Sequence, residues 1–141
     1  MSDYRVKNIE PIAVSEDIRV RVFTLAHRNL VPWHYHSTNT DHYFVLRGQL
    51  EIETRNPDER RVLKAGERHQ VLPRIPHRIS NGSISDCQFL LVQGVGKYDW
   101  HSAETSIDAL RNENLALRDQ VADLAVGIRI LRDQLRDGGK S

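Results

Sequence analysis

The chain has 141 residues, of which 28% are charged and 39% hydrophobic, and its formal net charge at pH 7 is +1. This charge balance is unlike the basic surface of a nucleic-acid-binding protein, and no apolar run approaches the roughly 20 residues of a membrane-spanning helix. The first residues lack the apolar stretch of a secretory signal peptide. Cys87 is the only cysteine, so no disulfide can form within the chain. We therefore expect a cytoplasmic protein without nucleic-acid or membrane partners.

Short β-strands are predicted through the first hundred residues. Residues 1–17 are mixed in character, and Ile18–Ala26 then alternates as a half-buried strand does. Further strands are predicted at Leu30–His36, His42–Leu46, Gln49–Thr54, Arg60–Leu63, His69–Leu72, His77–Ser80 and Asp86–Gln93. Turn sequences such as Asn81-Gly82 separate them. Short strands at this even spacing predict an all-β sandwich or barrel.

A helical periodicity replaces the strand pattern near residue 102. The apolar positions that follow are three and four residues apart in alternation: Ile107, Leu110, Leu117, Val121, Leu124, Ile128, Leu131 and Leu135, with Asn114 in the same series. Thr105 and Asp108 have the spacing of an N-terminal helix cap. These apolar positions form a seam along one side of the helix. β-Branched residues at one position of the repeat and leucine at the other favour a parallel two-stranded coiled coil.

We therefore predict two parts, a β-barrel over residues 1–101 and an amphipathic coiled-coil helix over residues 102–141. A single asparagine in the seam, Asn114, fixes the register of such a coil at some cost in stability. The chain is expected to form a homodimer through residues 107–135. The alternative is a helix that packs on its own barrel.

Two histidines separated by one residue stand in one predicted strand. His34 and His36 point to the same face, because side chains alternate along a strand. Asp41 on the next strand can add a carboxylate oxygen, and His77 can add a third imidazole. Such a set suits one divalent transition metal, Fe, Mn, Ni, Cu or Zn. The alternative for a histidine pair of this spacing is two exposed strand residues.

The stretch over residues 28–81 resembles the two sequence motifs of the cupin superfamily. The matching residues are His34, His36 and Gly48 in the first motif and Gly66, His77 and Asn81 in the second. The resemblance implies a double-stranded β-helix, also called a jelly-roll or cupin barrel, with a metal ion in its mouth. The family's metal ligands fall on His34, His36, Asp41 and His77.

Several family positions hold other residues here. The family glutamate is Asp41, one methylene shorter, which either binds the metal or acts through water. The leading glycine of the first motif is Arg28. In the second motif the middle glycine is Arg74 and the proline is Leu72. These departures bear on the fourth ligand more than on the three histidines.

Candidate catalytic residues are Asp41, Tyr43 and His69. Tyr43 shares the strand parity of Asp41, and it is either an acid or base in the cavity or a packed core aromatic. His69 is either an acid or base in the pocket or a core histidine. Trp100 is expected to close the barrel end or contact a partner rather than bind substrate. Cys87 is expected to be a small buried hydrophobic residue.

The resemblance implies one of two kinds of function. The first is a metal-dependent cupin enzyme that acts on a small organic molecule, by dioxygenase, isomerase, lyase or cyclase chemistry. The second is a non-catalytic dimeric module that binds or senses a metal or a small ligand. The fold does not decide between them, because one fold hosts many functions.

Overall fold

The computed structural model describes the backbone of residues 5–138, and it describes their side chains except at residues 109, 112, 113, 115, 116, 119, 127, 133 and 136–138. The chain divides into two compact units, residues 1–104 and residues 105–141. Each unit is described by itself. In the described part of the chain, no helix combines the length and the apolar character needed to cross a membrane.

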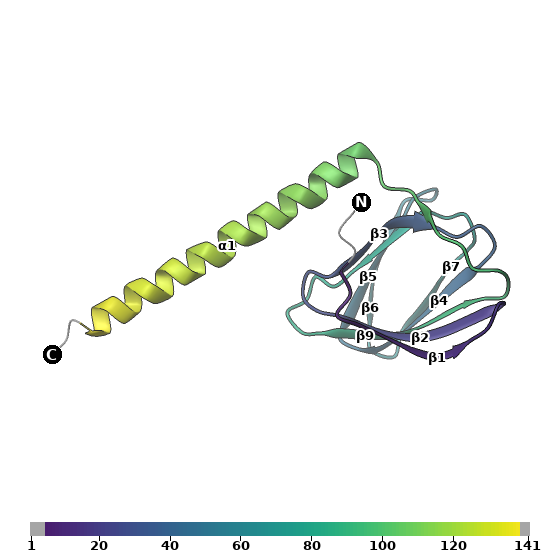
Figure 1. The fold of residues 1–141 in the computed structure, drawn as a ribbon, viewed down its shortest axis with the longest axis horizontal. Coiled ribbons are helices and arrows are strands. Elements are labelled where there is room, and N and C mark those ends of the chain that lie inside the picture. The colour runs from purple at the N-terminus through teal and green to yellow at the C-terminus, as the bar shows by residue number, and fades with distance from the viewer. Residues whose placement is uncertain (1–4, 139–141) are drawn as a thin grey trace. The chain divides into compact units, whose positions relative to one another are not determined.

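The first unit is built from two antiparallel β-sheets (Figure 1). Its strands are β1 (Asn8–Val14), β2 (Ile18–Leu25), β3 (Leu30–Tyr35), β4 (Thr40–Arg47), β5 (Gln49–Thr54), β6 (Glu59–Lys64), β7 (Arg68–Val71), β8 (His77–Ser80), β9 (Cys87–Gly94) and β10 (His101–Ser102). One sheet has the order β1-β2-β9-β4-β7 and the other β10-β3-β8-β5-β6. The all-β jelly-roll architecture predicted from the sequence is thereby confirmed.

The core lies between the two sheets and is formed by the inward residues of alternating strands. In β9 the buried positions include Cys87, Phe89 and Leu91, and Phe89 stacks on Phe23 of β2 with ring centroids 5.2 Å apart. Each large apolar side chain that is fully buried stabilises the fold by about 1.5–3 kcal/mol. Cys87 is fully buried, as expected of a small hydrophobic residue.

Two strands were not predicted. β1 forms an edge of its sheet and is exposed at nearly every residue, so its sequence lacks the alternation of a half-buried strand. It also contains Pro11, which an edge strand tolerates because it donates no hydrogen bond to a further neighbour. β10 has only two residues, His101 and Ser102, which pair with Tyr35 and His34 of β3. Two residues are too few to show a period.

The backbone keeps a left-handed conformation at positions where the cupin motifs place glycine. Gly48 has φ 75°, and a Cβ added there would lie 2.5 Å from the carbonyl oxygen of Asp86. Arg28 and Arg74 have φ 69° and 65°, although both carry a Cβ. A left-handed residue other than glycine costs about 1–2 kcal/mol. The turns are therefore retained at these two sites despite the loss of glycine.

The motif asparagine, Asn81, ties the loop between β8 and β9 to the end of β2. Its buried side chain donates hydrogen bonds to the carbonyl oxygens of Leu25 (2.9 Å) and Ser85 (2.8 Å). Its Oδ1 accepts from the backbone N–H (3.0 Å) and the hydroxyl (2.7 Å) of Ser83. All these groups are satisfied internally, so Asn81 has a structural role.

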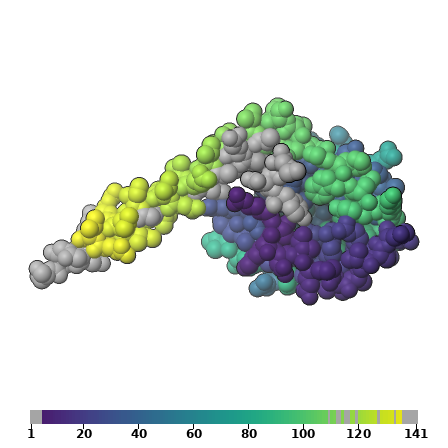
Figure 2. All heavy atoms as spheres, viewed as in Figure 1, coloured from purple at the N-terminus to yellow at the C-terminus, as the bar shows by residue number. Residues whose placement is uncertain are grey.

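The chain that follows β9, residues 95–100, lies against β2 and the β3–β4 loop; we call it the 95–100 segment. Gly96 donates its N–H to the carbonyl of Asp17 (2.9 Å), and its own carbonyl accepts from the Asn39 amide (2.6 Å). The Thr38 hydroxyl donates to the carbonyl of Lys97 (3.0 Å). Figure 2 shows the green residues that follow β9 beside the purple N-terminal strands on one face of the barrel.

The second unit contains helix α1 (Ser106–Gly138). Its N-terminus has a reciprocal cap: the Thr105 hydroxyl accepts from the N–H of Asp108 (3.2 Å), and the Asp108 carboxylate accepts from the N–H of Thr105 (2.8 Å). The cap expected from the sequence is thus present. The described apolar residues of the seam, from Ile107 to Leu135, are exposed by more than half of their surface.

Candidate metal centre

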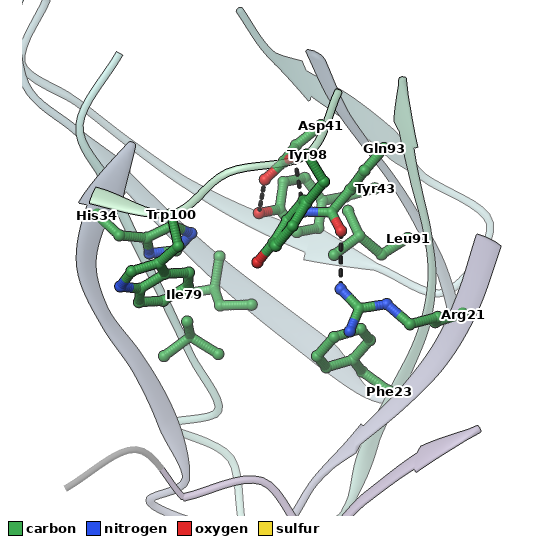
Figure 3. Close-up of a pocket in the computed structure, with 11 residues that line it drawn as sticks. Arg21, Phe23, His34, Asp41, Tyr43, Ile79, Leu91, Gln93, Tyr98 and Trp100 are labelled. Atoms are coloured by element: carbon green, nitrogen blue, oxygen red, sulfur yellow. Dashed lines mark hydrogen bonds between the residues drawn. The ribbon is translucent and has the colours of Figure 1, made fainter. Parts of the chain in front are cut away.

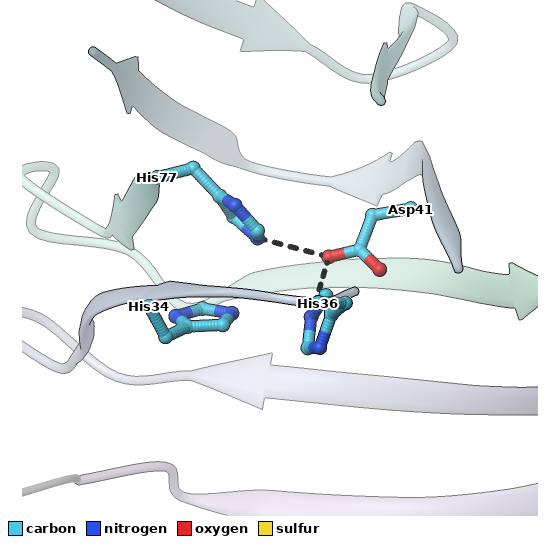
Figure 4. A group of neighbouring side chains, drawn as sticks. All are labelled: His34, His36, Asp41 and His77. Atoms are coloured by element: carbon cyan, nitrogen blue, oxygen red, sulfur yellow. Dashed lines mark hydrogen bonds and ion pairs between the residues drawn. The ribbon is translucent and has the colours of Figure 1, made fainter. Parts of the chain in front are cut away.

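Four side chains of the cupin motifs meet between the two sheets (Figure 4). His34 on β3 lies directly opposite His77 on β8, in the same sheet. His36 follows β3 by one residue, and Asp41 on β4 approaches from the other sheet. The β3–β8 register shifts between Val31 and His34, an irregularity of the kind often found beside functional sites.

The distances within this group suit a single metal ion. One donor atom from each residue lies within 4.8 Å of all the others, and each of the four residues is no more than 3% exposed. Oδ2 of Asp41 is 3.0 Å from Nε2 of His77 and 3.3 Å from Nε2 of His36. Two ligands that bind one ion at about 2.1 Å, at angles somewhat above 90°, are about 3.0–3.3 Å apart.

Backbone carbonyls orient all three imidazoles. The Nδ1 atoms contact the carbonyl oxygens of Pro32 (from His34, 2.7 Å), Asp99 (from His36, 2.6 Å) and Ile75 (from His77, 2.9 Å). A carbonyl oxygen only accepts hydrogen bonds, so each Nδ1 carries a hydrogen. In the neutral ring Nε2 then has the lone pair and is available to a metal.

A positive charge is required at the centre of the group. Two Nε2 lone pairs directed at a carboxylate would repel it, unless a proton or a metal ion lies between them. Burial by itself lowers the pKa of His36, but the hydrogen bond and the charge of Asp41 outweigh burial and raise it. Burial and the neighbouring His77 lower the pKa of His34 to about 2, so that ring stays neutral. The donor set therefore fits a divalent metal.

Asp41 remains ionised, and hydrogen bonds hold both oxygens of its carboxylate. Burial favours its neutral form, but hydrogen bonds with His36 and His77 outweigh burial and keep the pKa of the carboxyl below its usual range. The Tyr43 hydroxyl donates to Oδ2 (2.9 Å) and the Gln93 amide donates to Oδ1 (3.0 Å). The carboxylate thus reaches the imidazoles although it is one methylene shorter than the family glutamate.

A cavity of about 280 Å³ adjoins the group (Figure 3). His34, Asp41 and Tyr43 line it on the side of the imidazoles. The other lining residues are apolar (Phe23, Val31, Ile79 and Leu91), polar (Arg21, Gln93 and Tyr98) or aromatic at the rim (Trp100). The volume lies just below the usual range for ligand pockets, roughly 300–1,000 Å³. The space therefore suits a small organic molecule.

Arg21 and Gln93 were not identified from the sequence. The Arg21 guanidinium donates from Nη2 to Oε1 of Gln93 (2.7 Å), and the same amide donates to Asp41. Gln93 shares strand parity with Phe89 and Leu91, so a polar residue at an inward position of an apolar strand was the available signal. Arg21 shares parity with Phe23, but alternation alone does not tell which face of β2 is inward.

The 95–100 segment contributes two aromatic side chains to the cavity. Trp100 stacks on His34 with ring centroids 3.8 Å apart and planes at 8°, and it remains 40% exposed. Rather than only closing the barrel end, as expected, Trp100 lines the cavity. Tyr98 lies beneath the Arg19 guanidinium at 3.8 Å, and burial raises the pKa of its hydroxyl. The Tyr98 phenol thus keeps its proton at neutral pH.

His69 does not join the group. It lies on β7 directly opposite Tyr43, but it is only partly buried and is not among the residues that line the cavity. Burial and the charge of Arg61 lower its pKa. The structure thus brings together five predicted residues and adds Gln93 to them. The five predicted residues are His34, His36, Asp41, His77 and Tyr43. His69 lies outside this group.

Comparisons with known proteins agree with this architecture. One similar structure is an uncharacterized conserved protein with a double-stranded β-helix domain from Klebsiella pneumoniae, with a TM-score of 0.59 and 25% identity over 68% of this chain and 86% of that one. A cupin-2 domain protein from Shewanella frigidimarina has a TM-score of 0.53 and 19% identity, over 64% of this chain and 82% of that one.

A third similar structure is an oxalate oxidase in complex with the substrate analogue glycolate. Its TM-score is 0.62 and its identity 16%, over 72% of this chain and 57% of that one, a likeness that shows the fold alone. No curated protein matches the chain. The family model of the cupin domain matches residues 21–93, just over half of the sequence. The chain therefore belongs to the cupin domain family.

Proposed function

We propose that this cupin is a metal-dependent enzyme that converts a small organic molecule in the cavity beside its metal. The proposed ligands of one divalent transition metal are His34, His36, Asp41 and His77. The main support is the orientation of the three imidazoles, whose Nδ1 atoms are held by backbone carbonyls so that Nε2 faces the centre. Imidazole and carboxylate donors suit Fe, Mn, Ni, Cu or Zn.

The chain's own residues would bind the substrate and exclude water around it. A bound divalent metal supplies a Lewis acid at the cavity wall. His34 and Asp41 belong both to the ligand group and to the cavity lining, so a molecule in the cavity lies against them. Tyr43 acts through Asp41, because its hydroxyl donates to Oδ2 and fixes that carboxylate. Tyr98 presents a protonated hydroxyl to the same cavity, and its ring centroid lies 5.3 Å from that of His36.

Metal analysis tests the ligand assignment. Purified protein is expected to contain about one divalent transition metal per chain, and the double variant His34→Ala/His77→Ala should contain almost none, because two of four ligands are lost. The matched control is His27→Ala/His69→Ala, which removes two imidazoles outside the group and should keep its metal. Far-UV circular dichroism checks that both variants fold. A folded His34→Ala/His77→Ala variant with full metal content would contradict the assignment.

Turnover distinguishes the enzyme from a non-catalytic sensor module. We expect the metal-loaded protein to convert at least one member of a panel of small carboxylates, ketones and sugars, followed by NMR, and the His34→Ala/His77→Ala variant to convert none. Ligand binding at full metal content without any conversion would favour the sensor module.

We also propose that α1 pairs with α1 of a second copy as a parallel coiled coil through residues 107–135. Supporting this, the seam is regular and its described apolar side chains, such as Val121 and Leu124, are exposed on the helix unit. An apolar stripe of this length on a single helix is stabilised when a partner covers it. The homodimer would thus be joined by an element separate from the barrel.

A further inference from the structure

The cavity contains one cationic side chain that the metal group does not use. Arg21 lines the cavity from β2, and Figure 3 shows its guanidinium directed inward, apart from His34 and Trp100. Its Nη2 is held by Gln93 at 2.7 Å, and its guanidinium carbon lies 4.8 Å from the centroid of the Phe23 ring. The guanidinium is therefore positioned by an amide and an aromatic ring and does not extend into bulk solvent.

The charges around the cavity favour an anion. Among the cavity-lining residues, Arg21 and Asp41 carry opposite charges, and the Asp41 carboxylate is already engaged by Tyr43 and Gln93. A divalent metal held by neutral imidazoles makes the total positive. Arg19, which covers the Tyr98 ring at 3.8 Å, adds a second cation beside the cavity. An anionic ligand is drawn into such a site, and a cationic ligand is repelled.

The shape of the cavity favours an organic anion over an inorganic one. Apolar side chains, among them Leu91 and Ile79, line the space beside Arg21. Guanidinium groups bind carboxylates with two parallel hydrogen bonds, which also fixes the ligand's orientation.

We propose that the cavity binds a small organic carboxylate, and that Arg21 is the residue that recognises its carboxylate group. The apolar body of the ligand then lies against Leu91, Ile79 and the Trp100 ring, and its reactive part faces His34 and Asp41. This inference rests on the proposed function, because it assigns the substrate class of the same site.

Ligand binding to the metal-loaded full chain tests this assignment. The probes are benzoate and propanoate, each paired with its neutral amide, benzamide or propanamide, which has nearly the same shape. Affinities come from calorimetry and from the fluorescence of Trp100, which lines the cavity. We expect wild-type protein to bind at least one of the two carboxylates about 10-fold more tightly than its amide, a difference of about 1.4 kcal/mol, since a hydrogen bond to a charged group is stronger than one between neutral groups.

Two arginine variants separate recognition from general electrostatic attraction. Arg21→Gln should weaken carboxylate binding about 10-fold and leave amide binding unchanged, while Arg21→Lys should recover part of the loss. Arg19→Gln removes the same charge two residues earlier on β2, outside the cavity lining, and should weaken carboxylate binding much less than Arg21→Gln does. Metal content and circular dichroism are measured for every variant, because Arg21 also contacts Gln93 beside Asp41.

Three results would overturn the proposal: equal carboxylate affinity in Arg21→Gln and wild type, an equal loss in Arg19→Gln, or no binding of either carboxylate by metal-loaded protein. The last result leaves the metal centre intact and refutes only the ligand class. A wild-type protein that takes up no metal would instead refute the proposed function, and the comparison of Arg21→Gln with wild type would still test carboxylate recognition.

Discussion

Each imidazole of the candidate centre is oriented by a main-chain carbonyl, and one of these carbonyls belongs to a distant loop. His34 and His77 each use the carbonyl of the residue two positions earlier in the chain. His36 instead uses Asp99, which is 63 residues away in the sequence. The Asp99 carboxylate accepts from the N–H of Ser37 at 2.8 Å and so fixes the loop beside His36. The position of one ligand therefore depends on a surface side chain.

Replacement of Asp99 by alanine should weaken metal binding about 10-fold, since residues that orient metal ligands typically contribute 10–100-fold in affinity. Asp99→Asn keeps an acceptor for the N–H of Ser37 and should lose less. Competition with a chromophoric chelator measures both affinities. An unchanged affinity in Asp99→Ala would show that the backbone alone holds His36.

The pH dependence of metal affinity in wild type and Asp99→Ala follows from the directions of the pKa shifts of Asp99 and His36. Hydrogen bonds with Ser37 lower the pKa of Asp99 to about 2, so its carboxylate is charged at every pH above that value. His36, with a raised pKa, gains a proton as the pH falls, and the proton competes with the metal. Metal affinity should thus fall towards acid pH in both proteins, but less steeply in Asp99→Ala, because the charge of Asp99 is one of the causes that raise the pKa of His36. The difference in affinity between wild type and Asp99→Ala should therefore narrow from about pH 8 to about pH 5.

The strands and the helix differ in what they need to be stable. Most strands pair with a neighbour far away in the sequence, as β2 does with β9 over eight registered positions, whereas the edge strands β1 and β6 pair only with a consecutive strand. Helix α1 satisfies its own backbone hydrogen bonds and has a cap, but its apolar stripe is exposed within its unit. Burial of that stripe in the proposed coiled coil would stabilise this element.

A pair of lysine substitutions tests the coiled coil. Leu124 lies in the seam and Val126 on the outer face, and the two are exposed by 66% and 53%. Leu124→Lys places a charge at the dimer interface in both copies and should raise the dimer dissociation constant about 100-fold, the equivalent of about 1.5 kcal/mol per leucine. Val126→Lys adds the same charge and should have no effect. Sedimentation velocity measures both.

A stable dimer of Leu124→Lys at micromolar concentration would contradict the proposed seam and point to association through the barrels. Equal dissociation of both variants would indicate a general effect of charge on the helix rather than a specific interface.

At the scale of the whole molecule, the candidate centre joins the two sheets of the barrel. His34 and His77 come from one sheet and Asp41 from the other, so a metal bound between them would crosslink the sheets at one point. The donor atoms are brought together only in the folded chain. A metal that binds the folded state alone stabilises it by mass action.

Metal removal should therefore lower the melting temperature of the barrel. A ligand at 100 times its dissociation constant stabilises by about 2.7 kcal/mol. About 1 kcal/mol moves the melting temperature of a domain of about 100 residues by roughly 4 °C, so a chelator should lower it by about 10 °C. Tryptophan fluorescence follows the transition, because both tryptophans lie in the first unit. The His34→Ala/His77→Ala variant should not respond, and an equal response there would exclude this centre as the cause.

The sequence by itself determined the class of fold, the positions of most strands and the helix, and the residues of the candidate centre. Alternation in β2 and β5, and the seam of α1, are local patterns that depend only on which side of an element faces apolar neighbours. The spacing of His34, His36 and His77 relative to Gly48 and Gly66 identified the motifs. Asp41 was identified as part of the group, but the sequence did not tell whether its shorter side chain reaches the imidazoles.

The tertiary structure alone decided what surrounds the candidate metal centre. Arg21, Gln93, Tyr98 and Trp100 come from β2, β9 and the 95–100 segment, and their convergence depends on the pairing of the strands and on the carbonyl of Asp99. His69 satisfies the same parity rule as Tyr43, yet it lies outside the cavity. A periodic pattern records the direction of a side chain from its own strand, whereas a cavity depends on distances between strands that are remote in the sequence.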